Sequence, residues 1–222
     1  MALSKQNAVR TAGALWVIQL LAAIISYSVI LDPIIYKQDF LATIAENHSL
    51  IKIAVLADLL CGLAVVAIAV ILYPILKEFS QRMALWYFGL RIVEFVTIII
   101  ASIFLLSLLS ISMNIATVDP NLLELLAKTI RKQRDWAQNI TILMFSAGAI
   151  VIYILFYMTK LIPRFISIWG LIGVILSASE ILFGIFGYQL PFFVYLPMGT
   201  NELFLGFWLM IKGFNPVKVE LT

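Results

Sequence analysis

Long apolar stretches recur along the chain, separated by short segments that carry charged residues, glycine or proline. Six stretches match the length of roughly 20 residues that a helix needs to cross about 30 Å of hydrocarbon. They cover residues 12–31, 51–76, 83–110, 136–159, 163–186 and 190–211. These runs are far too long for barrel strands, and a helix satisfies its own backbone hydrogen bonds in lipid. The pattern therefore predicts an all-α, polytopic membrane protein, a bundle of six transmembrane helices.

The segment between the third and fourth predicted spans has its own pattern. Asp119 followed by Pro120 is typical of a helix start, and apolar residues follow at helical spacing: Leu122, Leu123, Leu126 and Ile130. We predict an amphipathic helix in this outer loop, lying on the membrane surface or covering the bundle. The alternative is a solvated extension of the fourth span. Most of the outer positive charges lie in this loop: Lys128, Arg131, Lys132 and Arg134.

Composition supports the membrane assignment. Hydrophobic residues make up 63% of the chain and charged residues 12%, whereas about a quarter of a soluble domain is charged. The 222 residues fit one helical bundle with short connections, so we expect a single domain, residues 1–222. The net charge of +3 is spread over span ends, which is unlike a nucleic-acid-binding face. The lipid bilayer is the expected partner, and a slight bias of Lys and Arg places both termini in the cytoplasm.

Five ionisable residues fall inside the predicted spans: Asp58, Arg91, Glu94, Glu180 and Glu202. A charge near the bilayer centre costs about 2.5 to 3.5 kcal/mol on insertion scales, so these side chains must face the bundle interior, pair with one another or be neutral. One arginine cannot balance four acids. We therefore expect at least one of Asp58, Glu180 and Glu202 to hold a proton. If the faces converge, they form a polar cavity that is acidic toward the outside and closed by Arg91 toward the cytoplasm.

Three of the carboxylates lie on helix stripes of small residues, where helices approach closely. The stripes are Ala54, Cys61 and Gly62 around Asp58, Gly173, Ser177 and Gly184 around Glu180, and Gly199 and Gly206 around Glu202. Arg91 and Glu94, three residues apart, are spaced to form a pair on one helix. Small-residue faces of this kind also suit a homo-oligomer. The alternative to a functional site is that these polar groups only fix which helices pair.

Motifs for the common cofactors and reactions are missing from the sequence. His48 is the one histidine and Cys61 the one cysteine, so neither a histidine zinc site nor a cysteine metal site is expected. No phosphate-binding glycine loop, dinucleotide fingerprint or serine-nucleophile elbow occurs. We expect no metal, no cofactor and no catalytic residue, although a carboxylate pair without histidine can support acid–base chemistry.

Short motifs along the chain resemble a known family. They are AVRTAG at residues 8–13, RIVE at 91–94, LIPR at 161–164, and the segment 202–214 with Glu202, Trp208 and Lys212. Together they resemble the bacterial family called domain of unknown function 4386. The resemblance implies six spans in a prokaryotic cell membrane and brings no established reaction or substrate.

The sequence is compatible with three functions. The first is an intramembrane acidic pocket, formed by Asp58, Arg91, Glu94, Glu180 and Glu202, that binds or transports a small cation, a proton or an amphipathic molecule. The second is a lipid-directed enzyme that uses the same carboxylates. The third is a scaffold or regulator that binds another membrane protein through its small-residue faces.

Overall fold

A computed structural model describes residues 4–113, 119–188 and 190–216, and every regular element in these ranges is helical. The first predicted span is continuous but changes its winding, from α-helix to a π-helical segment and back. The elements are α1 (Lys5–Ile24), η1 (Ile25–Leu31), α2 (Asp32–Ile35), α3 (Phe40–Glu46), α4 (His48–Leu76), α5 (Gln81–Ser112), α6 (Pro120–Thr159), α7 (Arg164–Ile185), η3 (Phe192–Tyr195) and α8 (Leu196–Ile211).

Five helical segments in the described residues are long and apolar enough to cross a membrane. They are Lys5–Ile35, His48–Leu76, Gln81–Ser112, Pro120–Thr159 and Arg164–Ile185. The described part of the chain thus has only helical elements, and its apolar helices are consistent with an integral membrane protein. The sixth predicted span, residues 190–211, is not confirmed, because α8 has 16 residues and is only about 24 Å long at 1.5 Å per residue. Its first predicted turns instead contain the short 3₁₀ helix η3.

The predicted outer-loop helix is part of a longer element. Asp119 caps α6 as expected, since its carboxylate accepts hydrogen bonds from the backbone N–H groups of Asn121 at 2.9 Å and Leu122 at 3.1 Å. From this cap the helix runs without a break for 40 residues. A separate amphipathic helix is therefore not confirmed. The same residues are the first turns of α6, in line with the alternative that they extend the fourth span.

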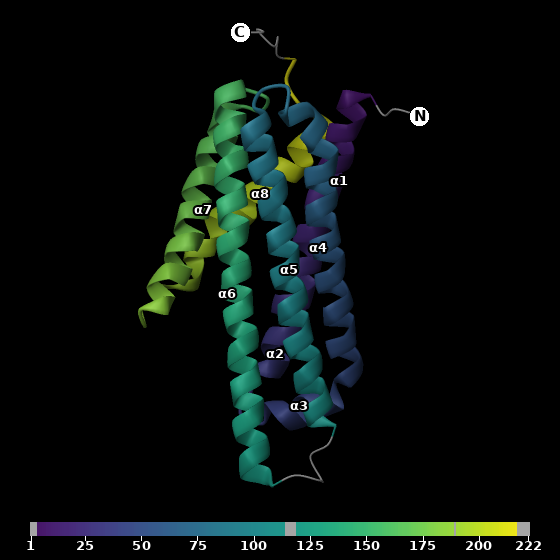
Figure 1. The fold of residues 1–222 in the computed structure, drawn as a ribbon, viewed down its shortest axis with the longest axis vertical. Helices are drawn as coiled ribbons and strands as arrows, with labels where there is room; N and C mark the ends of the chain where they lie inside the picture. The colour runs from purple at the N-terminus through teal and green to yellow at the C-terminus, as the bar shows by residue number, and fades with distance from the viewer. Residues whose placement is uncertain (1–3, 114–118, 189, 217–222) are drawn as a thin grey trace.

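The helices form a ring in which each packs on its two neighbours. Going round, α1 packs on α4, α4 on α5, α5 on α6, α6 on α7, α7 on α8, and α8 on α1. In Figure 1, α1 begins and α8 ends at the same end of the bundle, while α2, α3 and the start of α6 extend past α7 at the opposite end. Because α8 crosses the bundle obliquely, it meets α7 near its start and α1 near its end (Figure 1).

Two separate apolar cores hold the ring together. One lies toward the end where the chain begins and includes Trp16, Leu72 and Phe156. The other lies toward the α3 end and includes Ile35 and Leu105. The turns of α4, α5 and α6 between these cores carry polar and ionisable residues. The fold therefore separates two dry cores by a polar layer.

Small residues on the predicted stripes serve helix contacts within the chain. A Cβ atom at Gly206 would lie 2.7 Å from the Val17 side chain of α1, and one at Gly173 would lie 2.8 Å from the Met198 backbone of α8. These glycines allow the two helix pairs to approach closely. Around Gly184 and Gly199 there is open space. Association between copies of the chain stays a prediction.

Candidate functional site

A buried ion pair lies in the middle of α5. The guanidinium of Arg91 meets the carboxylate of Glu94 with 2.6 Å between Nη1 and Oε2, and the two side chains are 2% and 5% exposed. The guanidinium also lies over the rings of Tyr87 at 5.1 Å and Phe145 at 5.3 Å. Such ring contacts attract a cation through the ring quadrupole. The predicted pairing on one helix is what the structure shows.

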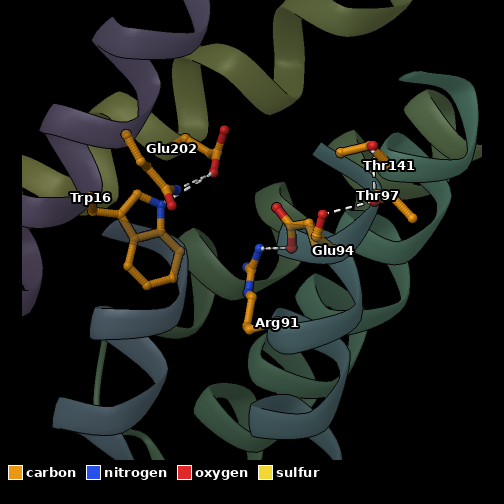
Figure 2. Close-up of polar contacts among 7 residues, drawn as sticks. Trp16, Arg91, Glu94, Thr97, Thr141 and Glu202 are labelled. Carbon is orange, nitrogen blue, oxygen red and sulfur yellow. Dashed lines mark hydrogen bonds and ion pairs between the residues drawn. The ribbon is translucent and has the colours of Figure 1, made fainter. Parts of the chain in front are cut away.

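Glu202 of α8 faces the same space from the other side of the ring (Figure 2). Its Oε1 atom accepts hydrogen bonds from Trp16 Nε1 at 3.2 Å and Gln19 Nε2 at 3.3 Å, both on α1. The other carboxylate oxygen accepts none from the described residues. Because α1 and α8 approach closely, Trp16 and Gln19 can donate to one carboxylate oxygen of Glu202. The second oxygen stays available for another donor, although Glu202 is only 8% exposed.

Two threonine hydroxyls tie this site to α6. Thr97 donates to the backbone carbonyl of Glu94 at 2.7 Å, and Thr141 of α6 donates to the Thr97 hydroxyl oxygen at 2.9 Å (Figure 2). Thr97 and Thr141 are both buried. Hydrogen bonds of this kind across transmembrane helices fix the rotation of one helix against another. They hold the Glu94 turn in register with α6.

A cavity of about 180 Å³ opens between these groups. The acidic and basic residues of its lining are Asp58, Glu94, Arg134 and Glu202, and the amides are Gln19 and Gln138. The apolar walls come from Leu20, Val65, Ile98, Ile142 and Phe145. The π-helical segment η1 supplies Tyr27, and π-helical turns are frequent at functional sites. A few polar groups set in apolar walls are typical of a small-molecule site.

The structure brings four of the five predicted site residues together. Asp58, Glu94 and Glu202 line the cavity, and Arg91 lies beside it, paired with Glu94. Glu180 is not among the lining residues. It lies on α7, where its carboxylate accepts a hydrogen bond from the Tyr195 hydroxyl. Three of the predicted residues thus line a cavity and Glu180 does not. That this cavity is a functional acidic pocket stays a prediction.

Sequence reasoning missed Arg134 as a cavity residue and placed it in the outer loop. Its side chain is 2% exposed. The signal was present in the spacing, because Arg134, Gln138, Thr141 and Phe145 recur at intervals of four, three and four residues and thus share one helix face. All four line the cavity. This shared face was not recognised because the predicted fourth span began at Trp136, which left Arg134 outside it.

Arg134 is held loosely by Tyr36 and Tyr27, near the end of the first span, and by Asp135 on its own helix. Its Nη1 atom lies 3.5 Å from the Tyr36 hydroxyl oxygen and 3.6 Å from Asp135 Oδ1, and its guanidinium lies 5.3 Å from the Tyr27 ring centre. The Tyr36 hydroxyl donates to Asp135 Oδ1 at 2.7 Å. Burial, followed by this hydrogen bond, raises the pKa of Tyr36 above its ordinary value. The Tyr36 hydroxyl therefore stays protonated and keeps its hydrogen bond to Asp135.

Residues 11–213 match the family model described as "Domain of unknown function (DUF4386)". The chain belongs to this family. The match confirms the resemblance that the short motifs indicated, and it covers every cavity residue named above. No curated protein and no solved structure matches this DUF4386 chain. Among its described residues, no group of three or more His, Cys, Asp or Glu is placed to hold a metal ion.

Proposed function

We propose that this DUF4386 protein binds a small amphipathic cation inside the membrane. Glu202 holds the charged group, and the apolar cavity walls hold the hydrocarbon part. The proposal depends on the Glu202 carboxylate, which lines the cavity. One of its oxygens accepts hydrogen bonds from Trp16 and Gln19, and the other has no hydrogen-bond partner among the described residues. A buried carboxylate of this kind is costly unless it gains a cation or a proton.

The charges around the cavity favour a cation as occupant. Asp58, Glu94 and Glu202 supply three carboxylates, while Arg91 and Arg134 supply two guanidinium groups. The carboxylates outnumber the guanidinium groups by one when all five are ionised, which favours an occupant that carries a cationic group. The volume of about 180 Å³ is slightly above the 150 Å³ of a cavity that accepts benzene. This size suits a molecule of roughly six to ten non-hydrogen atoms.

The protein works as a multi-pass protein of a bacterial cell membrane, with η3 and α8 making a sixth crossing and both termini in the cytoplasm. Support comes from the shared end at which α1 begins and α8 ends (Figure 1), since an even number of crossings returns the chain to its starting side. The Lys and Arg bias near that end supports the cytoplasmic assignment. In this orientation Arg91 lies on the cytoplasmic side of the cavity and Arg134 on the outer side.

The test is calorimetric titration of the purified protein in lipid nanodiscs with n-hexylammonium, which joins a cation to a short apolar chain. We expect Glu202→Gln to weaken binding tenfold or more, because hydrogen bonds to charged groups contribute about 1.5–3 kcal/mol and 1.4 kcal/mol is a factor of ten. Glu180→Gln is the matched control and should leave affinity unchanged. Equal affinity in the wild type and Glu202→Gln, or equal losses in both variants, would contradict the proposal.

A neutral ligand distinguishes the contribution of the ligand's charge to binding from that of its apolar chain. n-Hexanol has the same chain without the charge, so its affinity should be low and insensitive to Glu202→Gln. Thermal unfolding of both variants shows that the fold is retained. If n-hexanol binds as tightly as n-hexylammonium, the carboxylate has no role in recognition.

A further inference from the structure

Arg134 marks one end of an elongated cavity. The lining face of α6 runs from Arg134 through Gln138 and Thr141 to Phe145, which is about 16 Å along the helix axis at 1.5 Å per residue. Phe145 lies against Arg91 and so marks the opposite end, near Glu94. The cavity therefore has Glu94, paired with Arg91, toward its inner end and Arg134 at its outer end, and Asp58 lies within electrostatic range of Arg134.

The hydrogen-bonding capacity of Arg134 is largely unused. A guanidinium has five N–H donors, but the polar contacts of Arg134 with described residues involve only Nη1, at 3.5 Å to Tyr36 and 3.6 Å to Asp135. Its guanidinium also lies 5.3 Å from the Tyr27 ring centre. Both Nη1 distances exceed the usual range of 2.7–3.2 Å. A charged side chain that is 2% exposed and poorly paired is costly to the fold. Its remaining donors suit a further acceptor in the cavity that Arg134 lines.

The neighbouring acidic residues do not accept hydrogen bonds from the remaining donors of Arg134. Asp135 is engaged by the Tyr36 hydroxyl at 2.7 Å, and its geometry toward Arg134 is not bidentate. Asp58 lies within electrostatic range of Arg134, but no ion pair joins these two described residues. The planar fork of arginine matches a carboxylate or phosphate group, with two parallel hydrogen bonds. The missing partner is therefore an anionic group that enters the cavity.

We infer that the occupant is a zwitterion, with its ammonium group at Glu202 and its carboxylate or phosphate group at Arg134. This inference rests on the proposed function: the cationic group stays at Glu202, and the ligand gains an anionic group that binds Arg134. The two charged groups are joined by a short apolar chain that lies against Ile98 and Ile142. The cavity then holds both ends of the ligand by charge and its middle by apolar contact.

The test compares n-hexylammonium with 6-aminohexanoate, which adds a carboxylate to a chain of matching length. In wild-type protein in nanodiscs, we expect 6-aminohexanoate to bind about tenfold more tightly. Arg134→Gln should abolish this advantage and keep the affinity for n-hexylammonium. The matched control is Arg131→Gln on the same helix, since Arg131 contacts the Ile35 carbonyl and the Phe40 ring and does not line the cavity. It should retain the preference.

Two outcomes overturn the inference while leaving the proposed function standing. One is that n-hexylammonium and 6-aminohexanoate bind equally to the wild type. The other is that Arg134→Gln leaves the affinity for 6-aminohexanoate unchanged or weakens both ligands equally. If n-hexylammonium does not bind at all, the proposed function itself fails.

A second comparison needs no variant, in case Arg134→Gln does not fold. The methyl ester of 6-aminohexanoate keeps the chain and the ammonium group and removes the negative charge. We expect the ester to lose the tenfold advantage in wild-type protein. An ester that binds as tightly as the acid overturns the inference.

Discussion

Replacing Arg91 with methionine should destabilise the folded protein by about 3–5 kcal/mol, because it leaves the Glu94 carboxylate buried without its partner. The substitution removes a 2.6 Å ion pair between two side chains that are 2% and 5% exposed. It also removes the cation that lies over the rings of Tyr87 and Phe145. Unfolding in a detergent titration, followed by circular dichroism, measures the effect.

The double replacement Arg91→Met with Glu94→Leu separates pairing from packing. With both charges removed and the side-chain volume roughly kept, stability should return most of the way to the wild-type value, since a buried pair can be replaced by apolar residues at little cost. If the double variant is as unstable as Arg91→Met, the two residues do not act as a pair. If Arg91→Met is as stable as the wild type, the guanidinium does not stabilise this site.

Replacing Gly13 with alanine should lower stability by about 1–3 kcal/mol through overpacking. A Cβ atom at this position would lie 2.7 Å from the Met210 backbone nitrogen and 2.9 Å from the Gly206 carbonyl oxygen, so α1 and α8 must separate. Trp16 lies one turn further along α1 and donates to Glu202. The same change should therefore weaken n-hexylammonium binding, as measured by calorimetry.

Gly184→Ala is the control for this replacement. Nothing lies within 4 Å of a Cβ atom at Gly184, and alanine favours a helix over glycine by about 1 kcal/mol. Its stability and ligand affinity should match or slightly exceed those of the wild type. A Gly13→Ala protein as stable as Gly184→Ala would show that α1 and α8 are not closely packed.

The apolar pattern predicted the long helices because a membrane span needs length and hydrophobicity, and both are local properties of sequence. It did not predict the ring order or the rotation of each helix. The Glu180 stripe illustrates the limit: Gly173 packs on α8, whereas Gly184 faces open space. A stripe of small residues shows that a helix can approach another closely, but it does not identify the partner.

The cavity was predicted in part because buried charges in a membrane must face the interior. Asp58, Glu94 and Glu202 met this condition and line one cavity. Arg134 was missed since the hydrophobic stretch begins at Trp136, whereas α6 begins at Pro120 and carries its inward face beyond that limit. Trp16 and Gln19, which donate to Glu202, were expected at the membrane interface, because aromatic and amide residues near span ends usually lie there.

Cys61 offers the most direct test of the central claim that an acidic cavity lies within the bundle. It is the one cysteine of the chain, it lines the cavity, and it lies within electrostatic range of Glu94, Asp58 and Glu202. We compare its modification in nanodiscs by two methanethiosulfonates of similar size, one cationic (2-aminoethyl) and one anionic (2-sulfonatoethyl), followed by intact-protein mass spectrometry. An acidic cavity concentrates cations by tenfold or more, so the cationic reagent should react at least about tenfold faster. Equal rates, or no modification until the protein unfolds, would contradict the account.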